Sequence, residues 1–207
     1  MKHLGSTNNG WYENRRINTF FTVILYLYFF TNNIQADVIS SLKLELDQQE
    51  SIDVITSRLN TKSLSSYTND TNPTAFFNSI GVDGSWSDVN YNDKHSADGW
   101  APTTHLNRLK TMAIAFRSPA SSWFENIEMQ TKIEKGLLFY KAKNPQDDDN
   151  WWYGEIGDPQ IYMVATLLLK GYSSYEKILE IATYLRDVTD NASHQGQNRA
   201  WVSEILT

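Results

Sequence analysis

The sequence predicts an all-α fold in which helical hairpins form two layers, an inner ring and an outer ring. Apolar residues recur every three or four positions in successive segments, and no run shows the alternation that is typical of a strand. One segment, Gln160–Lys170, is apolar nearly all round, so we expect a buried inner helix between amphipathic neighbours. A helical bundle is the structural alternative.

Composition narrows the chemistry that the 207-residue chain can perform. It contains no cysteine, which excludes disulfides, thiolate metal sites and cysteine nucleophiles. The four histidines are scattered and no glycine-rich nucleotide loop occurs, so we expect no metal and no cofactor. The net charge of −6 argues against nucleic-acid binding. An acidic ligand would therefore be recognised by local donors and by stacking, or by basic groups elsewhere, and not by the overall field.

Residues 1–36 are typical of a secretory signal peptide. Positive residues precede an uncharged apolar run, and a small-residue cleavage site follows it. These features are Lys2, Arg15 and Arg16, the run Phe20–Thr31, and the site Ile34-Gln35-Ala36. The run is shorter than the roughly 20 residues that a membrane helix needs. We therefore expect a secreted protein without membrane contact after cleavage, and an uncleaved anchor is the alternative.

A helical lead-in is expected over residues 37–80. Its apolar residues recur at helical spacing, a polar stretch over residues 61–73 interrupts them, and a short helix should span Thr74–Ile80. The next stretch, residues 81–101, is long and rich in turn residues. Long ordered loops are often functional, but we expect Trp86 and Trp100 to attach this loop to the domain and not to contact a ligand.

Four helices are expected from residue 102 to residue 188, with a long loop between the second and the third and short links elsewhere, and each helix has a start or a stop signal. In chain order the signals are Pro102, Arg117-Ser118-Pro119, Ser121 or Ser122, Asn144-Pro145, Gly171, and Ser173 or Ser174. The buried helix is the third of the four. Consecutive helices should pack as antiparallel hairpins.

The most distinctive stretch, residues 147–160, places Trp151, Trp152 and Tyr153 between an acidic run and a Gly/Asp/Pro turn. Neighbouring residues of a helix point about 100° apart, so the three rings could not all face one interior. The turn residues favour a loop. Flat indole faces beside amide and carboxylate groups suit stacking on sugar rings, and a tryptophan lid over the core is the alternative.

A polar loop, residues 189–197, precedes a last helix that we expect over Asn198–Leu206. This helix ends at Thr207 without a cap, and its apolar residues have no following partner. We expect the chain to be a fragment of a longer protein.

Two motifs resemble those of polysaccharide lyase family 8, the hyaluronate, chondroitin AC and xanthan lyases. The run Asn150-Trp151-Trp152-x-x-Glu155-Ile156-x-x-Pro159-Gln160 is similar to the family's aromatic patch, and Gly196-Gln197-Asn198-Arg199 is similar to its element with a catalytic asparagine. Asp83-Gly84-Ser85-Trp86 resembles the opening of the same domain. The resemblance covers about residues 83–206 and implies an incomplete α/α toroid over residues 81–207.

The resemblance also implies roles for individual residues. Asn198 would neutralise the uronate carboxylate during β-elimination of an acidic polysaccharide, although a plain helix N-cap is the alternative for it. Trp151 and Trp152 would stack on sugar rings, and Asn150 would hydrogen-bond a sugar. Arg199 would either bind an anionic group of the polysaccharide or form a structural salt bridge within the protein. The family's histidine, tyrosine and arginine follow downstream, so we expect residues 37–207 to be inactive alone.

Two other functions compete with this interpretation. Glu155 and Asp158 could be the paired carboxylates of an α/α-barrel glycoside hydrolase, although Asp158 before Pro159 also suits a helix N-cap. A secreted, non-catalytic carbohydrate-binding or degenerate fragment is the alternative outside the enzymes.

Overall fold

The computed structural model describes residues 53–54, 56–96, 99–189 and 196–206. The predicted signal peptide and most of the predicted lead-in lie outside these residues. The chain separates into two compact units, Met1–Asp53 and Val54–Thr207, and the architecture below is that of the second unit.

The described residues form helices and turns, without a strand among them. A helical stretch over residues 56–64 comes first. The elements that follow are α2 (Thr71–Ser79), α3 (Ala101–Arg117), α4 (Ile127–Lys143), the π-helix η1 (Tyr153–Gly157), α5 (Asp158–Leu169), α6 (Tyr175–Thr189) and α7 (Gln197–Leu206). The predicted all-α class is confirmed.

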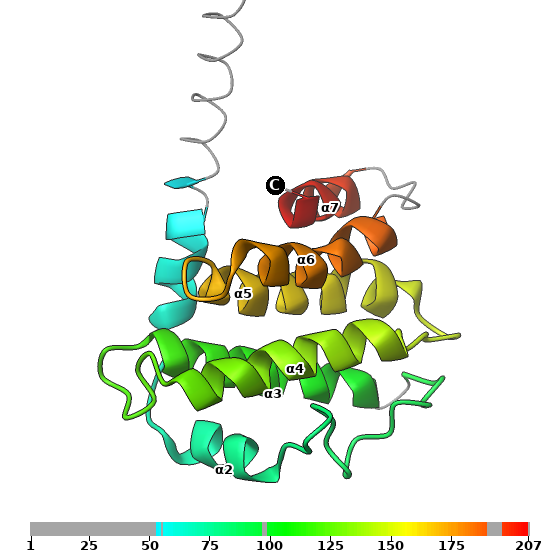
Figure 1. The fold of residues 1–207 in the computed structure, drawn as a ribbon. Helices are drawn as coiled ribbons and strands as arrows, with labels where there is room; N and C mark the ends of the chain where they lie inside the picture. Colours follow the sequence, from blue (N-terminus) through cyan, green and yellow to red (C-terminus); the bar gives the residue numbers. More distant parts are fainter. Residues whose placement is uncertain (1–52, 55, 97–98, 190–195, 207) are drawn as a thin grey trace, which may run out of the picture. The chain divides into compact units, whose positions relative to one another are not determined.

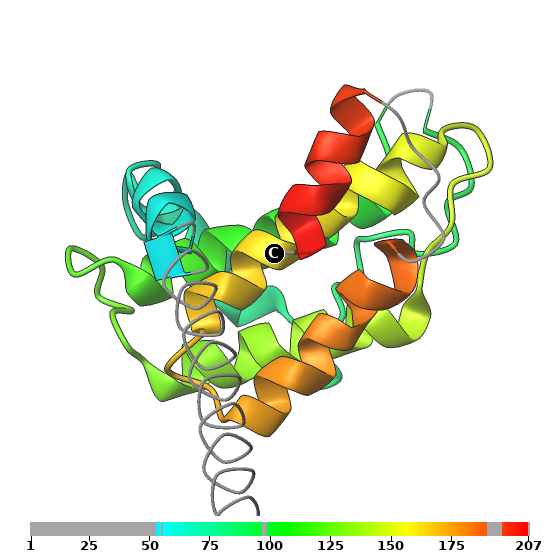
Figure 2. The same ribbon diagram turned by 90° about the horizontal axis from the view of Figure 1, so that it is seen from above.

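The helices after α2 lie in two layers (Figure 1, Figure 2). α3 packs against α5, and α5 packs against α7, which makes one layer. α4 packs against α6 and makes the other, while α3 contacts α4 and α5 contacts α6 across the layers. Successive helices therefore alternate between layers, as in part of an α/α toroid.

The core lies between the two layers and is built from large apolar side chains. Fully buried members from four helices are Leu106, Leu109, Met112 and Phe116, then Met129, Ile133 and Leu137, then Tyr162 and Leu168, and Ile181. Burial of each such side chain contributes about 1.5–3 kcal/mol before entropy is subtracted. α5 is buried over most of its circumference, which confirms the predicted inner helix.

Most predicted helix ends are confirmed, and one cap is wrong. Asn126, not Ser121 or Ser122, caps α4, because its Oδ1 accepts hydrogen bonds from the amides of Glu128 and Met129, both at 3.0 Å. The two serine hydroxyls instead donate to the carboxylate of Asp70, at 2.5 and 2.8 Å. That carboxylate joins the loop before α2 to the loop after α3.

The loop over residues 81–100 is attached to the domain by its tryptophans, as predicted. Trp86 is 1% exposed and Trp100 is 3% exposed. Trp86 Nε1 donates to Ser79 Oγ at 3.1 Å. Gly84 has a φ of +91°, and a Cβ there would lie 2.6 Å from the carbonyl of Lys135, so the loop can approach α4 only with glycine at this position. The Asp-Gly-Ser-Trp element is therefore structural.

Candidate functional site

The aromatic stretch is helical, so the loop predicted for it is wrong. Trp151 and Trp152 begin a helical segment that continues through η1 into α5. Asn150 starts it, since its Oδ1 accepts the Trp152 amide at 3.1 Å and its carbonyl accepts the Tyr153 amide at 3.2 Å. Asn150 Oδ1 is used by this cap, which leaves the Nδ2 amide as the group that could reach a sugar.

A π-turn allows the helix to continue through Gly157 and Pro159, the residues that indicate a turn in the sequence. The amide of Asp158 donates to the carbonyl of Tyr153, five residues back. Pro159 has no amide to donate, and a π-turn is one way in which a helix accommodates such a position. Gly157 permits close packing, because a Cβ there would lie 2.3 Å from Cζ3 of Trp152. The indole of Trp152 thus lies directly against the helix backbone.

Trp151 and Trp152 point into different hollows. Trp151, 47% exposed, lines a cavity of about 320 Å³ together with Asp147, Glu155 and Asp187. Trp152 is half-buried and lines a cavity of about 290 Å³ between α3 and α5. The angle of about 100° between neighbouring helical residues, which in the sequence favours a loop, instead places the two rings of this helix in different cavities.

The Trp152 cavity combines an apolar wall with a few polar groups, which is the usual composition of a ligand pocket. Its lining residues are Thr103, Lys110, Trp152, Tyr153, Gly157, Asp158, Gln160, Ile161 and Val164.

Asp158 is fully buried at the wall of the Trp152 cavity. Its carboxyl accepts hydrogen bonds from the hydroxyls of Tyr140 and Thr103, the latter at 2.7 Å. Burial raises the pKa of Asp158 to about 6, although both hydrogen bonds act to lower it. Asp158 is the first residue of α5 and Gly157 is the N-cap, so the predicted N-cap role of Asp158 is wrong.

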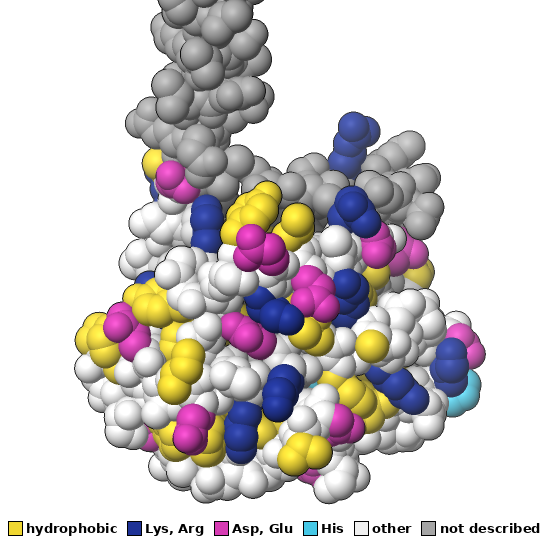
Figure 3. All heavy atoms as spheres, in the orientation of Figure 1, with side chains coloured by type: hydrophobic (Ala, Val, Ile, Leu, Met, Phe, Trp, Pro, Cys, Tyr) yellow, Lys and Arg dark blue, Asp and Glu magenta, His cyan; other side chains and the backbone are white. Residues whose placement is uncertain are grey.

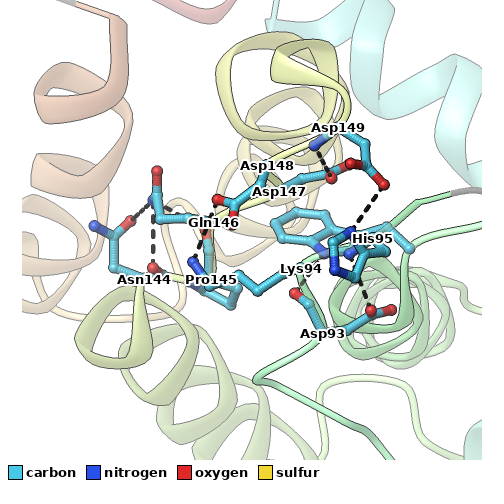
Figure 4. Close-up of polar contacts among 10 residues, drawn as sticks. Asp93, Lys94, His95, Asn144, Pro145, Gln146, Asp147, Asp148 and Asp149 are labelled. Carbon is cyan, nitrogen blue, oxygen red and sulfur yellow. Dashed lines mark hydrogen bonds and ion pairs between the residues drawn. The ribbon is translucent and has the colours of Figure 1, made fainter.

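The acidic run before the tryptophans holds the loop of residues 93–95 (Figure 4). His95 Nδ1 lies 3.0 Å from Asp149 Oδ2, and Lys94 Nζ lies 3.6 Å from Asp148 Oδ1. The Asp148 amide donates to the Lys94 carbonyl at 3.0 Å. Trp100, in the same loop, packs on Tyr153 at a ring distance of 5.7 Å. These contacts fix where the aromatic segment begins.

The helix that carries Asn198 and Arg199 packs against the aromatic segment. α7 contacts η1, α5 and α6. Asn198 is half-buried and Arg199 is exposed. α7 begins at Gln197, so Asn198 lies inside its first turn and is not the N-cap that was considered as an alternative. The two motifs are thus brought together through their elements, although their nearest residues, Gln160 and Gly196, are 36 positions apart in the sequence.

The carboxylates considered for a glycoside hydrolase do not meet. Glu155 lines the Trp151 cavity, whereas Asp158 lines the Trp152 cavity and is bound to Tyr140 and Thr103. Paired catalytic carboxylates need one shared space for the sugar. The geometry therefore gives no support to that alternative.

Three residues of this region were missed by sequence reasoning. Lys110 was part of an ordinary helical segment, and Gly157 was assigned to a turn. His105 was only counted among scattered histidines, yet it is fully buried, with Nε2 2.9 Å from the Gly136 carbonyl and Nδ1 2.9 Å from the Tyr91 hydroxyl. Burial lowers the pKa of His105 to about 4, so the ring is neutral.

The face over α4 and α6 carries basic and acidic side chains interspersed (Figure 3). Some of them are paired, as Lys177 Nζ is with Glu180 Oε2 at 2.8 Å. Such a mixture is typical of a solvated surface. Within the described part of the chain, no helix has the length and apolar character needed to cross a membrane.

Comparison with known proteins finds similarity to polysaccharide lyases by two criteria, sequence and structure. The family model of the polysaccharide lyase family 8 N-terminal alpha-helical domain matches residues 51–204. The chondroitinase-AC of Pedobacter heparinus is 30% identical over 93 residues, which are 45% of this chain and 13% of that protein.

Two solved structures share the fold. A chondroitinase AC lyase superposes with a TM-score of 0.63 at 21% identity, covering 74% of this chain and 23% of that one. A Paenibacillus xanthan lyase superposes with a TM-score of 0.51 at 20% identity, covering 76% and 17%. The chain thus spans less than a quarter of the length of each of these proteins.

Proposed function

This chain belongs to polysaccharide lyase family 8, and from that premise we propose that it forms the N-terminal helical part of a secreted lyase. The substrate would be a uronic-acid polysaccharide of the hyaluronan, chondroitin or xanthan type. One observation carries the proposal: the helix with Asn198 packs against the helical segment that carries Trp151 and Trp152. A sugar chain lying on the tryptophans would then pass close to an amide donor.

The chemistry of β-elimination explains why an asparagine suits this place. A base removes the proton from C5 of the uronic acid, the bond from C4 to the glycosidic oxygen breaks, and that oxygen takes up a proton. Charge accumulates on the carboxylate as the C5 proton leaves. A neutral amide offers two N–H donors that bind the charged carboxylate more strongly in the transition state than in the ground state. Asn198 would take this role.

The tryptophans would hold the polymer in register, and Asn150 and Arg199 would contribute polar contacts. Stacking of a pyranose on an indole buries apolar ring hydrogens while the hydroxyls stay solvated. The general base is proposed to lie outside residues 1–207, so this chain alone would bind oligosaccharides without cleaving them. A non-catalytic carbohydrate-binding role remains the second candidate, because it requires the same aromatic contacts and no base.

Replacement of Asn198 by Ala tests the proposal in the protein as its gene encodes it. We expect kcat to fall roughly 100- to 1000-fold, with KM changed little, because the amide acts mainly in the transition state. The assay follows the ultraviolet absorbance of the unsaturated product. Asn107→Ala is the matched control, since Asn107 is exposed on α3. Wild-type activity in Asn198→Ala would refute the role of Asn198, and oligosaccharide binding without any unsaturated product from wild type would favour the non-catalytic alternative.

A further inference from the structure

Lys110 is a half-buried cation inside the Trp152 cavity. It lies on α3 two turns after Thr103, and both residues line the cavity between α3 and α5. Lys110 also lines a second cavity of about 140 Å³, which is formed with residues 66–69, Asn72 and Pro73. The side chain thus separates two neighbouring hollows, one of which contains the indole of Trp152.

Lys110 differs from Arg108, Lys132 and Lys141, which are also half-buried, in having no counter-group among the described residues. Arg117 is likewise half-buried without an ion pair among these residues, but its guanidinium lies 4.0 Å from the centre of the Tyr172 ring. Arg108 binds Asp88 through two hydrogen bonds of 2.6 and 2.7 Å. Lys132 Nζ donates to the Phe77 carbonyl at 2.7 Å, and Lys141 Nζ donates to the Glu180 carbonyl at 2.7 Å. Among the residues that the structure describes, none forms a hydrogen bond or ion pair with Lys110.

An ammonium held partly out of water without a partner is unfavourable. Burial is the one cause that lowers the pKa of Lys110. A methionine or leucine of similar length would fill the same space beside Ile161 and Val164 without this penalty. Residues that reduce stability in this way are typical of binding sites, where a ligand supplies the missing charge.

We propose that Lys110 binds an anionic substituent, a carboxylate or a sulfate, on a sugar ring that lies against Trp152. Trp152 and Lys110 line the same cavity, so the indole provides an apolar face and the lysine provides a positive charge. Gln160 and Thr103 also line this cavity and can contact hydroxyls. This inference rests on the proposed function and adds to it the residue that selects an acidic sugar over a neutral one.

The charge of the rest of the chain makes a local cation necessary. The chain carries a net charge of −6, and the Trp151 cavity includes three carboxylates in its lining. The overall field therefore repels a polyanion, and attraction must come from single groups near the ring. A charge-assisted hydrogen bond in a half-buried site is about twice as strong as one between neutral groups.

Calorimetric titration of the 207-residue chain tests this inference. The probes are a chondroitin sulfate tetrasaccharide, a hyaluronan tetrasaccharide and the neutral chitotetraose. We expect Lys110→Met to weaken binding of the acidic probes about tenfold and to leave the neutral probe unchanged. A loss with both acidic probes indicates the carboxylate, and a loss with chondroitin sulfate alone indicates the sulfate. Lys135→Met, an exposed lysine on α4, is the matched control and should change affinity less than about twofold.

Thermal unfolding of the same variants separates binding from folding. Lys110→Met should melt at the wild-type temperature or above it, because the substitution removes an unpaired charge from a half-buried position. A lower melting temperature together with loss of the neutral probe would show a structural role and overturn the inference. Wild-type affinity of Lys110→Met for both acidic probes, with Trp152→Ala still impaired, would overturn it while the proposed function stands. Failure of the wild-type chain to bind either acidic probe would overturn both.

Discussion

Trp151 and Trp152 are neighbours in the sequence but belong to two different environments. Trp151 is 47% exposed beside a cavity whose lining includes Asp147, Glu155 and Asp187. Trp152 is half-buried against Gly157, in a cavity that Lys110 also lines. The angle of about 100° between successive helical residues produces this separation. A short aromatic motif can therefore line one cavity that includes three carboxylates and another that includes a lysine.

The two surfaces also differ in what supports them. The Trp152 cavity is backed by Asp158, which is bound to Tyr140 and Thr103 in the core between α3, α4 and α5. The Trp151 cavity is bordered by the loop before η1 and by the end of α6. Trp152 should accordingly be the better ordered and the more important ring for binding. Three predictions test this difference.

The largest predicted effect is on the pH dependence of the free energy of unfolding, to which the buried Asp158 at the Trp152 cavity contributes. The pKa of Asp158 is raised from 3.8 to about 6, so its contribution to the free energy of unfolding decreases as pH rises from 4 to 6. The pKa of His105 is lowered from 6.5 to about 4, so its contribution increases as pH rises over nearly the same range. The two contributions oppose each other and are each about 3 kcal/mol.

Asp158→Asn should therefore expose the contribution of His105. Urea unfolding should show that the variant loses about 3 kcal/mol more than wild type between pH 6.5 and pH 4. Asp187→Asn, which removes a carboxylate from the Trp151 cavity, is the control and should follow the wild-type profile, because Asp187 is not among the groups that shift the pKa of Asp158. If the free energy of unfolding of Asp158→Asn and of wild type changed with pH in parallel, the carboxyl group of Asp158 would not be protonated at mildly acidic pH.

The sequence predicted the fold better than the site, for physical reasons. Helical spacing and the apolar character of α5 report which residues are buried, so the two-layer architecture could be predicted. Gly157 and Pro159 are turn residues on average, and their helical conformation here depends on the π-turn and on the indole that packs on Gly157. Lys110 gave no signal, because its neighbours in space come from α5, about 50 residues later in the chain. Local patterns do not contain such contacts.

The second largest predicted effect is the loss of oligosaccharide affinity when each of the two tryptophans is replaced by alanine. Trp152→Ala should weaken binding of an acidic tetrasaccharide roughly 10- to 100-fold, since loss of a stacked aromatic side chain at a binding site typically costs about 2 kcal/mol or more. Trp151→Ala should weaken it only about threefold, because that ring is more exposed and shares its cavity with carboxylates. Titration of both variants against one oligosaccharide makes the measurement. Equal losses would mean that the two rings form one surface when ligand is bound.

The smallest predicted effect is the loss of affinity when the indole of Trp152 is displaced but not removed. Gly157→Ala would place a Cβ 2.3 Å from the indole, so the ring must move away from the backbone. We expect affinity to fall about three- to tenfold while the free energy of unfolding stays the same or rises, because alanine favours a helix over glycine by about 1 kcal/mol.

Gly154→Ala is the matched control for Gly157→Ala, since a Cβ at Gly154 meets no atom within 4 Å. It adds the same methyl group to the same π-turn and should raise stability by a similar amount. Gly154 lines the Trp151 cavity, so any loss of affinity should not exceed the roughly threefold loss expected for Trp151→Ala. If both alanines leave affinity unchanged, Trp152 tolerates displacement and the close packing on Gly157 serves the helix alone. If only Gly157→Ala loses affinity, the glycine is a positioning residue, and the contrast between the two tryptophans originates in the backbone beneath Trp152.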